Sequence, residues 1–327
     1  MKNSIDSLPP VSEMMRAAGL LPKKSLGQNF LFDLNLTGRI ARAVPALEHT
    51  TVIEVGPGPG GLTRALLVAG AKRVIAIEKD KTTAPILDTI AAASDGRLEI
   101  IYGDAMKIEN GKLKIENGPL AICANLPYNI GTELLIRWLH MMDSVGAQHV
   151  APGAASPRLC RAAHEPPLQI SSMTLMFQRE VAERIVARPG DAGYGRLSVL
   201  TALVADAKIL FNVPRTAFTP MPKVESAVVQ IVPRFPSIGG VARSAGEDST
   251  DTDKTLPASH SLGTPPMEGN TLQNIENLTA KLFGQRRKMI RGITPGVDWA
   301  AFGLTGTERA EELSPEKFAA LAAAGVV

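Results

Sequence analysis

Two hydrophobic periods alternate along the first half of the chain. Between residue 51 and about residue 130, short runs rich in Val and Ile are followed by stretches of helical period. The strand-like runs are TVIEVG, RVIAIE, LEIIYGD and LAICANLPYNI, and the helix-like stretches are LTRALLVAG and APILDTIAAA. This order is typical of βαβ units in a parallel sheet, and the continuously apolar runs indicate helices on both of its faces. The sequence therefore predicts a doubly wound α/β domain.

The second half of the chain adds strands and then helices. ISSMTLMFQREVAERIVA predicts a strand that runs into a helix, a Gly-rich loop follows at PGDAGYG, and LSVLTALVADA predicts another helix. KILFNVPRTAF and SAVVQIVPRF have the pattern of the last two strands. Helical periodicity returns in IENLTAKLFGQRRKMIRGI and in SPEKFAALAAAGV. These segments predict a small α-helical C-terminal domain.

Two stretches show no amphipathic period. Residues 141–169 combine Ala, Pro, Gly and His and predict a loop insertion. Residues 236–271 are rich in Gly, Ser, Thr, Pro and Asp and predict a flexible linker. We therefore expect a first domain over residues 1–235, the linker over 236–271 and the helical domain over 272–327.

Composition indicates a globular protein. The chain has 327 residues and is 45% hydrophobic, enough to bury a core in one large domain and one small one. Charged residues interrupt the N-terminus, so the sequence predicts neither a signal peptide nor a membrane span, and a cytoplasmic location is expected. Cys123 and Cys160 provide no metal-binding spacing and no disulfide framework.

Basic residues are concentrated in three places. The formal net charge of +3 is small for a nucleic-acid-binding protein, but local fields matter more than the sum. The basic positions are Lys23 and Lys24, then Arg179, Arg184 and Arg188, then Arg286, Arg287, Lys288 and Arg291. Each run is compatible with a solvated surface and also with RNA binding.

A Gly-rich turn, Glu54-Val55-Gly56-Pro57-Gly58-Pro59-Gly60-Gly61, follows the first predicted strand and precedes a helix. Glycines at Gly56 and Gly58 let the backbone approach a ligand closely, and the helix N-terminus offers N–H groups to an anion. A tight structural turn explains the same residues.

Two acidic residues close the next strands. Glu78 lies 22 residues after Gly56, close to the ~20-residue spacing at which a carboxylate reaches ribose hydroxyls. Asp104 follows the third strand, where it would accept a hydrogen bond from the amine of a cofactor adenine. The alternative for Glu78 is a solvated acid at a strand end. With the Gly-rich turn, these residues predict an adenosine-containing cofactor, and they do not distinguish a nicotinamide dinucleotide from S-adenosylmethionine.

The tetrad Asn125-Leu126-Pro127-Tyr128 ends the fourth predicted strand. Ligands bind at the carboxyl edge of such sheets. The side-chain oxygen of Asn125 and the carbonyl of Leu126, directed by Pro127, suit acceptance of hydrogen bonds from an amine. Tyr128 suits stacking on the base that bears this amine. The tetrad therefore predicts amine methylation, although a β-turn alone would explain it in isolation.

These motifs, together with several longer segments, resemble the ribosomal RNA adenine dimethyltransferases, and the resemblance covers nearly the whole chain. The matching segments are KSLGQNFL (24–31), the Gly-rich turn, Glu78, Gly103-Asp104, NLPYNI (125–130), FQREVAERIVARPGDAGYGRLSVL (177–200), FTPMPKVESAVV (218–229) and FGQRRKMIRG (283–292). Several of them resemble the small-subunit enzymes more than the macrolide-resistance enzymes that modify large-subunit RNA. The two stretches without period are longer than is usual in this family.

The resemblance implies a Rossmann-like class I methyltransferase sheet, a small helical domain and S-adenosylmethionine as the cofactor. The residues it places against the cofactor are Asn29, Leu31, Gly56, Glu78, Asp104 and Asn125. It also implies that Tyr128 and Phe218 stack on the target adenine. From the sequence alone, Phe218 is more simply explained as a packing aromatic at a strand boundary.

The implied reaction is transfer of methyl groups to the N6 amine of adenines in small-subunit ribosomal RNA, on adjacent adenosines of a 3′-terminal hairpin late in subunit assembly. The expected partner is RNA within the immature small subunit; no membrane is involved, and a monomer is expected. Two alternatives remain at this stage: a nicotinamide-dependent dehydrogenase and a non-catalytic assembly checkpoint.

The last motif predicts an RNA-binding surface. If residues 283–291 continue one helix, Arg287 and Arg291 share a face with Lys288 beside them, while Phe283 and Ile290 anchor the opposite side. The surface expected to contact RNA comprises Arg286, Arg287, Lys288 and Arg291.

Overall fold

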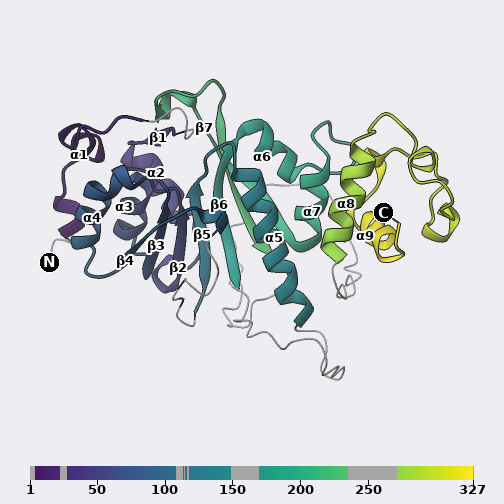
Figure 1. Cartoon of the computed structure of the whole chain (residues 1–327), viewed down its shortest axis with the longest axis horizontal. Coiled ribbons are helices and arrows are strands. Elements are labelled where there is room, and N and C mark those ends of the chain that lie inside the picture. Colours follow the sequence, from purple (N-terminus) through teal and green to yellow (C-terminus); the bar gives the residue numbers. More distant parts are fainter. Residues whose placement is uncertain are drawn as a thin grey trace, which may run out of the picture.

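A seven-stranded sheet lies at the centre of the molecule (Figure 1). The structure is a computed structural model that describes residues 4–22, 28–107, 113, 115, 118–148, 169–234 and 271–326. The strands, in spatial order, are β4 (Leu98–Tyr102), β3 (Arg73–Glu78), β2 (Thr51–Val55), β5 (Leu120–Asn125), β6 (Ile170–Gln178), β9 (Ser226–Pro233) and β7 (Ala205–Val213). The strands from β4 to β6 are parallel, and β9 is antiparallel to both of its neighbours. The predicted α/β fold is confirmed.

Helices cover both faces of this sheet. One cluster of buried side chains includes residues of α1 (Val11–Ala17), α2 (Leu34–Arg42), α3 (Gly61–Val68) and α4 (Ala84–Ala92). The other includes residues of α5 (Gly131–Gln148), α6 (Arg179–Val186) and α7 (Arg196–Val204). Successive side chains of a strand point to opposite faces, so Val52 belongs to the first cluster and Ile53 to the second. Burial on both faces explains the continuously apolar runs of the sequence.

The strand order reverses between β2 and β5. From β2 the chain proceeds to β3 and β4 on one side of the sheet, and β5 and β6 lie on the other side. Crossovers on the two sides of such a switch point leave a crevice beyond the carboxyl ends of the strands. The Gly-rich turn, Glu78, Asp104 and Asn125 lie at or just after the carboxyl ends of β2, β3, β4 and β5, at this edge of the sheet.

A two-stranded sheet joins two distant segments of sequence. β1 (Phe30–Leu31) pairs antiparallel with β8 (Phe218–Thr219), with Leu31 opposite Phe218. Two-residue strands carry no readable period, so the sequence did not predict this pairing. The pairing places the segment before α2 beside the segment before β9.

Short 3₁₀ helices complete the described elements. They are η1 (Ser4–Ser7), η3 (Leu47–His49), η4 (Lys81–Thr83), η5 (Ala105–Lys107), η7 (Arg215–Ala217), η8 (Ile290–Gly292), η9 (Trp299–Phe302) and η10 (Ala310–Glu312).

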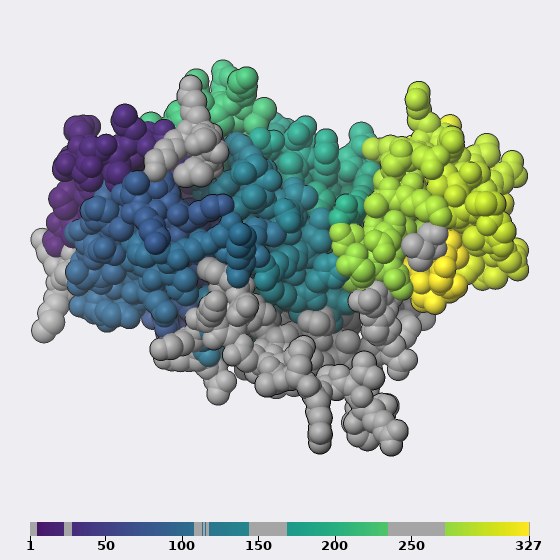
Figure 2. Space-filling view, viewed as in Figure 1, coloured from purple at the N-terminus to yellow at the C-terminus, as the bar shows by residue number. Residues whose placement is uncertain are grey.

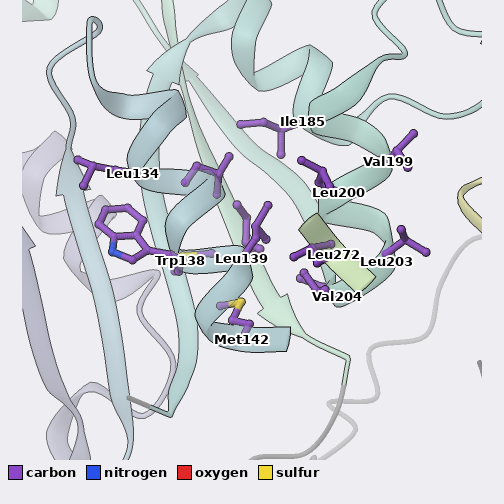
Figure 3. Packing of buried hydrophobic residues seen from close by; sticks show 14 of the residues in the cluster. Leu134, Trp138, Leu139, Met142, Ile185, Val199, Leu200, Leu203, Val204 and Leu272 are labelled. Atoms are coloured by element: carbon purple, nitrogen blue, oxygen red, sulfur yellow. The ribbon is translucent and has the colours of Figure 1, made fainter. Parts of the chain in front are cut away.

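The C-terminal part contains α8 (Thr271–Phe283) and α9 (Pro315–Ala323). Its buried side chains belong to the same cluster as those of α5 and α7, and Figure 3 shows Leu272 of α8 beside Leu203 and Val204 of α7. In Figure 2 the lime-to-yellow residues form one continuous surface with the teal region. The helical part therefore shares its core with the sheet.

Residues 141–148 correct the predicted loop insertion, because α5 continues to Gln148. Met142 is buried with Trp138 and Leu139 in one cluster (Figure 3). It therefore extends the apolar stripe of the helix by one more turn. Residues 149–168 lie outside the described residues, as do residues 235–270, which include nearly all of the predicted linker.

The predicted helix over 283–291 is also corrected. α8 ends at Phe283, and the chain then turns, with the Lys288 N–H donating to the carbonyl of Gln285 at 2.8 Å. Met289 next forms an antiparallel bridge with Arg309. This tertiary pairing carries the buried Ile290 back into the core and outweighs local helix propensity. Phe283 and Ile290 both reach the core as expected, but not from one helix.

A smaller boundary error lies between α7 and β7. Residues 205–207 were included in a predicted helix, whereas Ala205 begins β7 and pairs with Pro233 of β9. Pairing with β9 decides the conformation of this Ala-rich segment. None of the helices in the described part of the chain is both long and apolar enough to span a bilayer.

Candidate functional site

A cavity of about 310 Å³ opens at the carboxyl edge of the sheet, around the ends of β2, β3, β4 and β5. This volume is at the lower end of the size range of small-molecule sites, roughly 300–1,000 Å³. The predicted site residues that line it are Asn29, Leu31, Gly56, Gly58, Glu78, Asp104, Asn125, Leu126, Pro127 and Tyr128. The parallel sheet thus brings together segments that are far apart in sequence.

The turn between β2 and α3 is closed on one side by residues 30–31. Gly60 precedes α3 with a φ of 86°, a left-handed conformation that favours glycine. A Cβ atom added to Gly61 would lie 2.4 Å from the carbonyl oxygen of Leu31, and one added to Gly58 would lie 2.8 Å from the ring of Phe30. The turn therefore needs glycine, and the first N–H groups of α3 have no partner within the helix.

Glu78 is buried at the end of β3. Its Oε2 accepts a hydrogen bond from the Gly58 N–H at 2.9 Å, and its Oε1 accepts one from the Asp80 N–H at 2.6 Å. Burial raises the pKa of this carboxyl above its ordinary value. Each oxygen still has lone-pair capacity for one hydroxyl donor, so the predicted ribose contact fits this geometry.

Asp104 follows β4, the strand that pairs with β3. Its Oδ2 accepts from the Lys79 ammonium at 2.9 Å, and its Oδ1 accepts from the Met106 N–H at 3.0 Å. The hydrogen bond from Lys79 is the main reason why the pKa of Asp104 is lowered. The carboxylate is therefore an acceptor at neutral pH. Lys79 was not predicted, because its partner is 25 residues away.

Asn125 is oriented by the main chain of Asn29. The Nδ2 group of Asn125 donates to the carbonyl oxygen of Asn29 at 3.0 Å. This bond fixes which end of the amide is nitrogen, and it leaves Oδ1 as an acceptor in the cavity wall. The carbonyl of Leu126 follows, held by the restricted backbone before Pro127. Asn125 and Leu126, the two residues that the sequence assigned to amine binding, therefore both line the cavity.

Tyr128 is half-buried, and its hydroxyl reaches behind the cavity wall. The phenol oxygen lies 2.9 Å from Oγ of Ser226, and either hydroxyl can donate. Burial raises the pKa of this phenol, and the hydrogen bond with Ser226 partly opposes that effect. Ser226 belongs to the sequence segment 218–229, but no role was predicted for it.

Glu54 also lines the cavity, although the sequence analysis gave it no separate role. It is 1% exposed, and its Oε2 accepts a 2.6 Å hydrogen bond from the hydroxyl of Thr63 on α3. Burial raises its pKa to about 8. Glu54 is therefore mainly neutral at pH 7. Its position within an otherwise apolar strand is the sequence signal that could have identified it.

Phe218 is the one predicted catalytic residue that does not line the cavity. It is 3% exposed and packs in the cluster that contains Leu31, its partner across β1 and β8. This environment matches the simpler expectation of a packing aromatic. Stacking on a base would require its side chain to move.

The four predicted RNA-binding residues divide into two kinds. Arg286 forms an ion pair with Glu311 and donates to the carbonyl of Ala192 at 3.1 Å. The other three side chains are exposed and have no ion pair among the described residues: Arg287, Lys288 and Arg291.

The second basic run is largely paired as well. Arg179 contacts Glu183 at 2.9 Å and Glu225 at 3.2 Å, and Arg184 lies 3.8 Å from Glu180. Lys23 and Lys24 lie outside the described residues. The number of Lys and Arg residues in these runs therefore overstates the positive charge that is available to a phosphate backbone.

The cavity offers hydrogen-bond acceptors at three separate points, at the ends of β3, β4 and β5. Glu78 suits hydroxyl groups, Asp104 suits an amine, and Asn125 with the Leu126 carbonyl suits a second amine. The start of α3 at Gly61 adds N–H donors that suit a carboxylate. This donor and acceptor set fits an adenosine-containing ligand together with a second amine-bearing group.

Comparison with known proteins agrees with this chemistry. The sequence model described as "Ribosomal RNA adenine dimethylase" matches residues 20–243. The chain is 47% identical to the Ribosomal RNA small subunit methyltransferase A of Chelativorans sp. (strain BNC1), with 98% of each chain covered. It is 45% identical to the protein of the same name from Azorhizobium caulinodans, covering 98% of this chain and 94% of that protein.

Solved structures share the fold. A dimethyladenosine transferase from Plasmodium falciparum superposes with a TM-score of 0.61 at 22% identity, covering 90% of this chain and 95% of that one. The 23S rRNA methyltransferase ErmE gives a TM-score of 0.56 at 23% identity, covering 90% and 98%. At these identities the superpositions support the architecture and do not distinguish between substrates.

Proposed function

Because this chain belongs to the ribosomal RNA adenine dimethylase family, we propose that it transfers methyl groups from S-adenosylmethionine to the N6 amine of adenines in small-subunit ribosomal RNA. The observation that carries the proposal is the pair of acceptors at the end of β5, the anchored Asn125 side chain and the Leu126 carbonyl, in the wall of the cavity. When bound, the cofactor supplies an electrophilic methyl group on its sulfonium.

The described residues suit the binding of S-adenosylmethionine. Glu78 would accept from the ribose hydroxyls and Asp104 from the cofactor adenine amine, while the first N–H groups of α3, which begins at Gly61, would receive the carboxylate of the methionine part. Asn29 and Leu31 also line the cavity, and the Leu31 carbonyl packs against the Gly56–Gly61 turn. Each assignment uses a lone pair or an N–H group that the fold leaves available.

The target amine needs orientation more than deprotonation. Its lone pair is delocalised into the adenine ring, so hydrogen bonds to Asn125 and to the Leu126 carbonyl would favour a pyramidal nitrogen and stabilise the developing positive charge. Tyr128, and Phe218 if its side chain moves, would restore the stacking that a base loses on leaving the RNA. We assign no general base.

Small-subunit RNA is favoured as the substrate by the near-full-length relatives named for it. A large-subunit RNA adenine methyltransferase of the macrolide-resistance type shares the fold and is the second candidate. We further propose that the working substrate is RNA within the immature small subunit, that adjacent adenosines of a 3′-terminal hairpin are dimethylated late in assembly, and that the protein acts as a cytoplasmic monomer. A purely non-catalytic checkpoint does not explain the oriented acceptors.

Methylation of isolated ribosomal subunits tests the proposal. The purified protein is incubated with S-adenosylmethionine and with small or large subunits from a strain that lacks this methyltransferase, and the RNA is digested for mass spectrometry of its nucleosides. We expect N6,N6-dimethyladenosine in small-subunit RNA only. Product in large-subunit RNA alone would support the second candidate, and no product in either would contradict both.

A further inference from the structure

A buried serine lies directly behind the tyrosine of the tetrad. Ser226 is fully buried and does not line the cavity, whereas Tyr128 does. Their hydroxyl oxygens are 2.9 Å apart. The hydrogen bond therefore ties the far end of the Tyr128 side chain to a residue of the protein interior.

Ser226 is held on three sides. It begins β9, where it pairs with Gln178 of β6 and with Val213 of β7. The residue before it is fixed too: the Glu225 carbonyl accepts from the Arg179 N–H at 2.9 Å, and its carboxylate contacts the Arg179 guanidinium at 3.2 Å. The hydroxyl of Ser226 is thus a rigid point of attachment.

A tyrosine ring stays mobile about its side-chain torsions unless packing or a hydrogen bond restricts it. Tyr128 is only partly buried, so packing restricts it on one side. The hydrogen bond at its hydroxyl restrains the other end. It also commits the phenol to Ser226, which leaves the ring rather than the hydroxyl to meet a ligand.

We propose that Ser226 is a positioning residue for methyl transfer: it holds the Tyr128 ring where the target adenine stacks, and so keeps the once-methylated adenine in place for the second transfer. The inference rests on the proposed function, because it requires an adenine against Tyr128. Positioning acts on the chemical step, since small displacements of a reacting group lower its rate steeply.

Removing the hydrogen bond from either side tests this role. Ser226→Ala removes one hydroxyl, and Tyr128→Phe removes the other while keeping the aromatic ring. We expect each to lower kcat for dimethyladenosine formation by about threefold to tenfold, the range of one neutral hydrogen bond, with KM for the subunit nearly unchanged. The double variant should be no slower than the slower single variant, because both remove one interaction.

The ratio of products supplies a second readout. A looser platform lets the base leave after one transfer, so both variants should release more N6-methyladenosine relative to the dimethylated product. Ser172→Ala is the matched control. Ser172 is also a buried strand serine, 2% exposed on β6, but it pairs with Ala121 toward the opposite edge of the sheet. It should leave both the rate and the product ratio unchanged.

Cofactor affinity separates positioning from general damage to the cavity. Isothermal titration should give wild-type affinity for S-adenosylmethionine in both single variants. If Ser226→Ala lowers kcat while Tyr128→Phe does not, or if the effects multiply in the double variant, the hydrogen bond has no positioning role. If the wild-type protein forms no methylated adenosine, the proposed function fails first, and the inference fails with it.

Discussion

The cavity edge of the sheet and the basic segment 286–291 hold polar side chains in different ways. At the cavity, a second group fixes each key side chain: the Asn29 carbonyl holds Asn125, and Lys79 holds Asp104. In the basic segment only Arg286 is held in this way by a residue that the structure describes. Fixed acceptors suit directional chemistry on one atom, whereas exposed cations suit a phosphate backbone whose position varies. We therefore expect the cavity to recognise one atom of its target and the basic segment to bind a phosphate backbone.

The largest expected effect tests the fixed acceptors of the cavity. Asn125→Ala removes an acceptor aimed at charge that develops during transfer, and loss of one such group costs roughly 10²–10³ in rate. The variant should stay folded, because Asn125 is only partly buried at the end of β5. Single-turnover methylation with circular dichroism as the folding control measures both. Near-wild-type turnover would remove Asn125 from the mechanism.

The second largest effect tests the exposed cations of the basic segment. Replacing Arg287, Lys288 and Arg291 together by Gln should weaken RNA binding at low salt and flatten its salt dependence by roughly 0.7–0.9 log units per lost phosphate contact. Filter binding across ionic strength gives the slope. Cofactor affinity should not change, because none of the three lines the cavity. Parallel slopes for wild type and variant would mean that these residues only solvate the surface.

A smaller effect is expected at Glu78. Glu78→Ala should weaken binding of S-adenosylmethionine by about tenfold, as expected when a hydrogen-bonded carboxylate is lost, with less effect on the rate at saturation. A ribose contact is made equally in the ground and transition states, so its loss raises KM more than it lowers kcat. Titration calorimetry measures the affinity. An unchanged affinity would show that the ribose lies elsewhere.

The smallest expected effect distinguishes the paired Arg286 from the exposed cations of the basic segment. Arg286→Gln should leave the salt dependence of RNA binding unchanged and lower stability by about 1 kcal/mol, since a partly exposed ion pair and its hydrogen bond contribute little. Chemical denaturation measures the stability. Arg287→Gln is the matched control and should show the reverse pattern. If Arg286→Gln flattens the salt dependence instead, the contrast between the held and the exposed arginines is wrong.

The sequence predicted residues that the structure brings together around one cavity, because their signals are local. A strand end followed by Gly56–Gly61, Glu78, Asp104 or Asn125 has a fixed place once the sheet is parallel, and the resemblance supplied Asn29 and Leu31. The partners of these residues were not predictable. Lys79, Thr63 and Ser226 meet their partners only through the tertiary fold, and no spacing in the sequence encodes that meeting.

The prediction of one helix over residues 283–291 was wrong for the same reason. Residues 283–291 have good helix formers and the right apolar spacing, so local propensity favoured one helix. The bridge between Met289 and Arg309, with the Ile290 N–H donating to the Glu308 carbonyl at 2.9 Å, instead turns the chain. The four cations were found from sequence, but the separation of Arg286 from the others depended on Glu311, which lies 25 residues away.

Burial of Glu54 makes folding a proton-binding reaction. Its ordinary pKa of 4.5 applies to the unfolded chain, whereas the folded value is about 8. Between these values the folded protein holds a proton that the unfolded chain releases, so the free energy of unfolding should fall as pH rises toward 8 and level off above it. Glu54→Gln keeps the shape without the titration and should flatten this slope. Denaturation at pH 6 and pH 9 measures it, and a wild-type slope in the variant would assign the proton to another group.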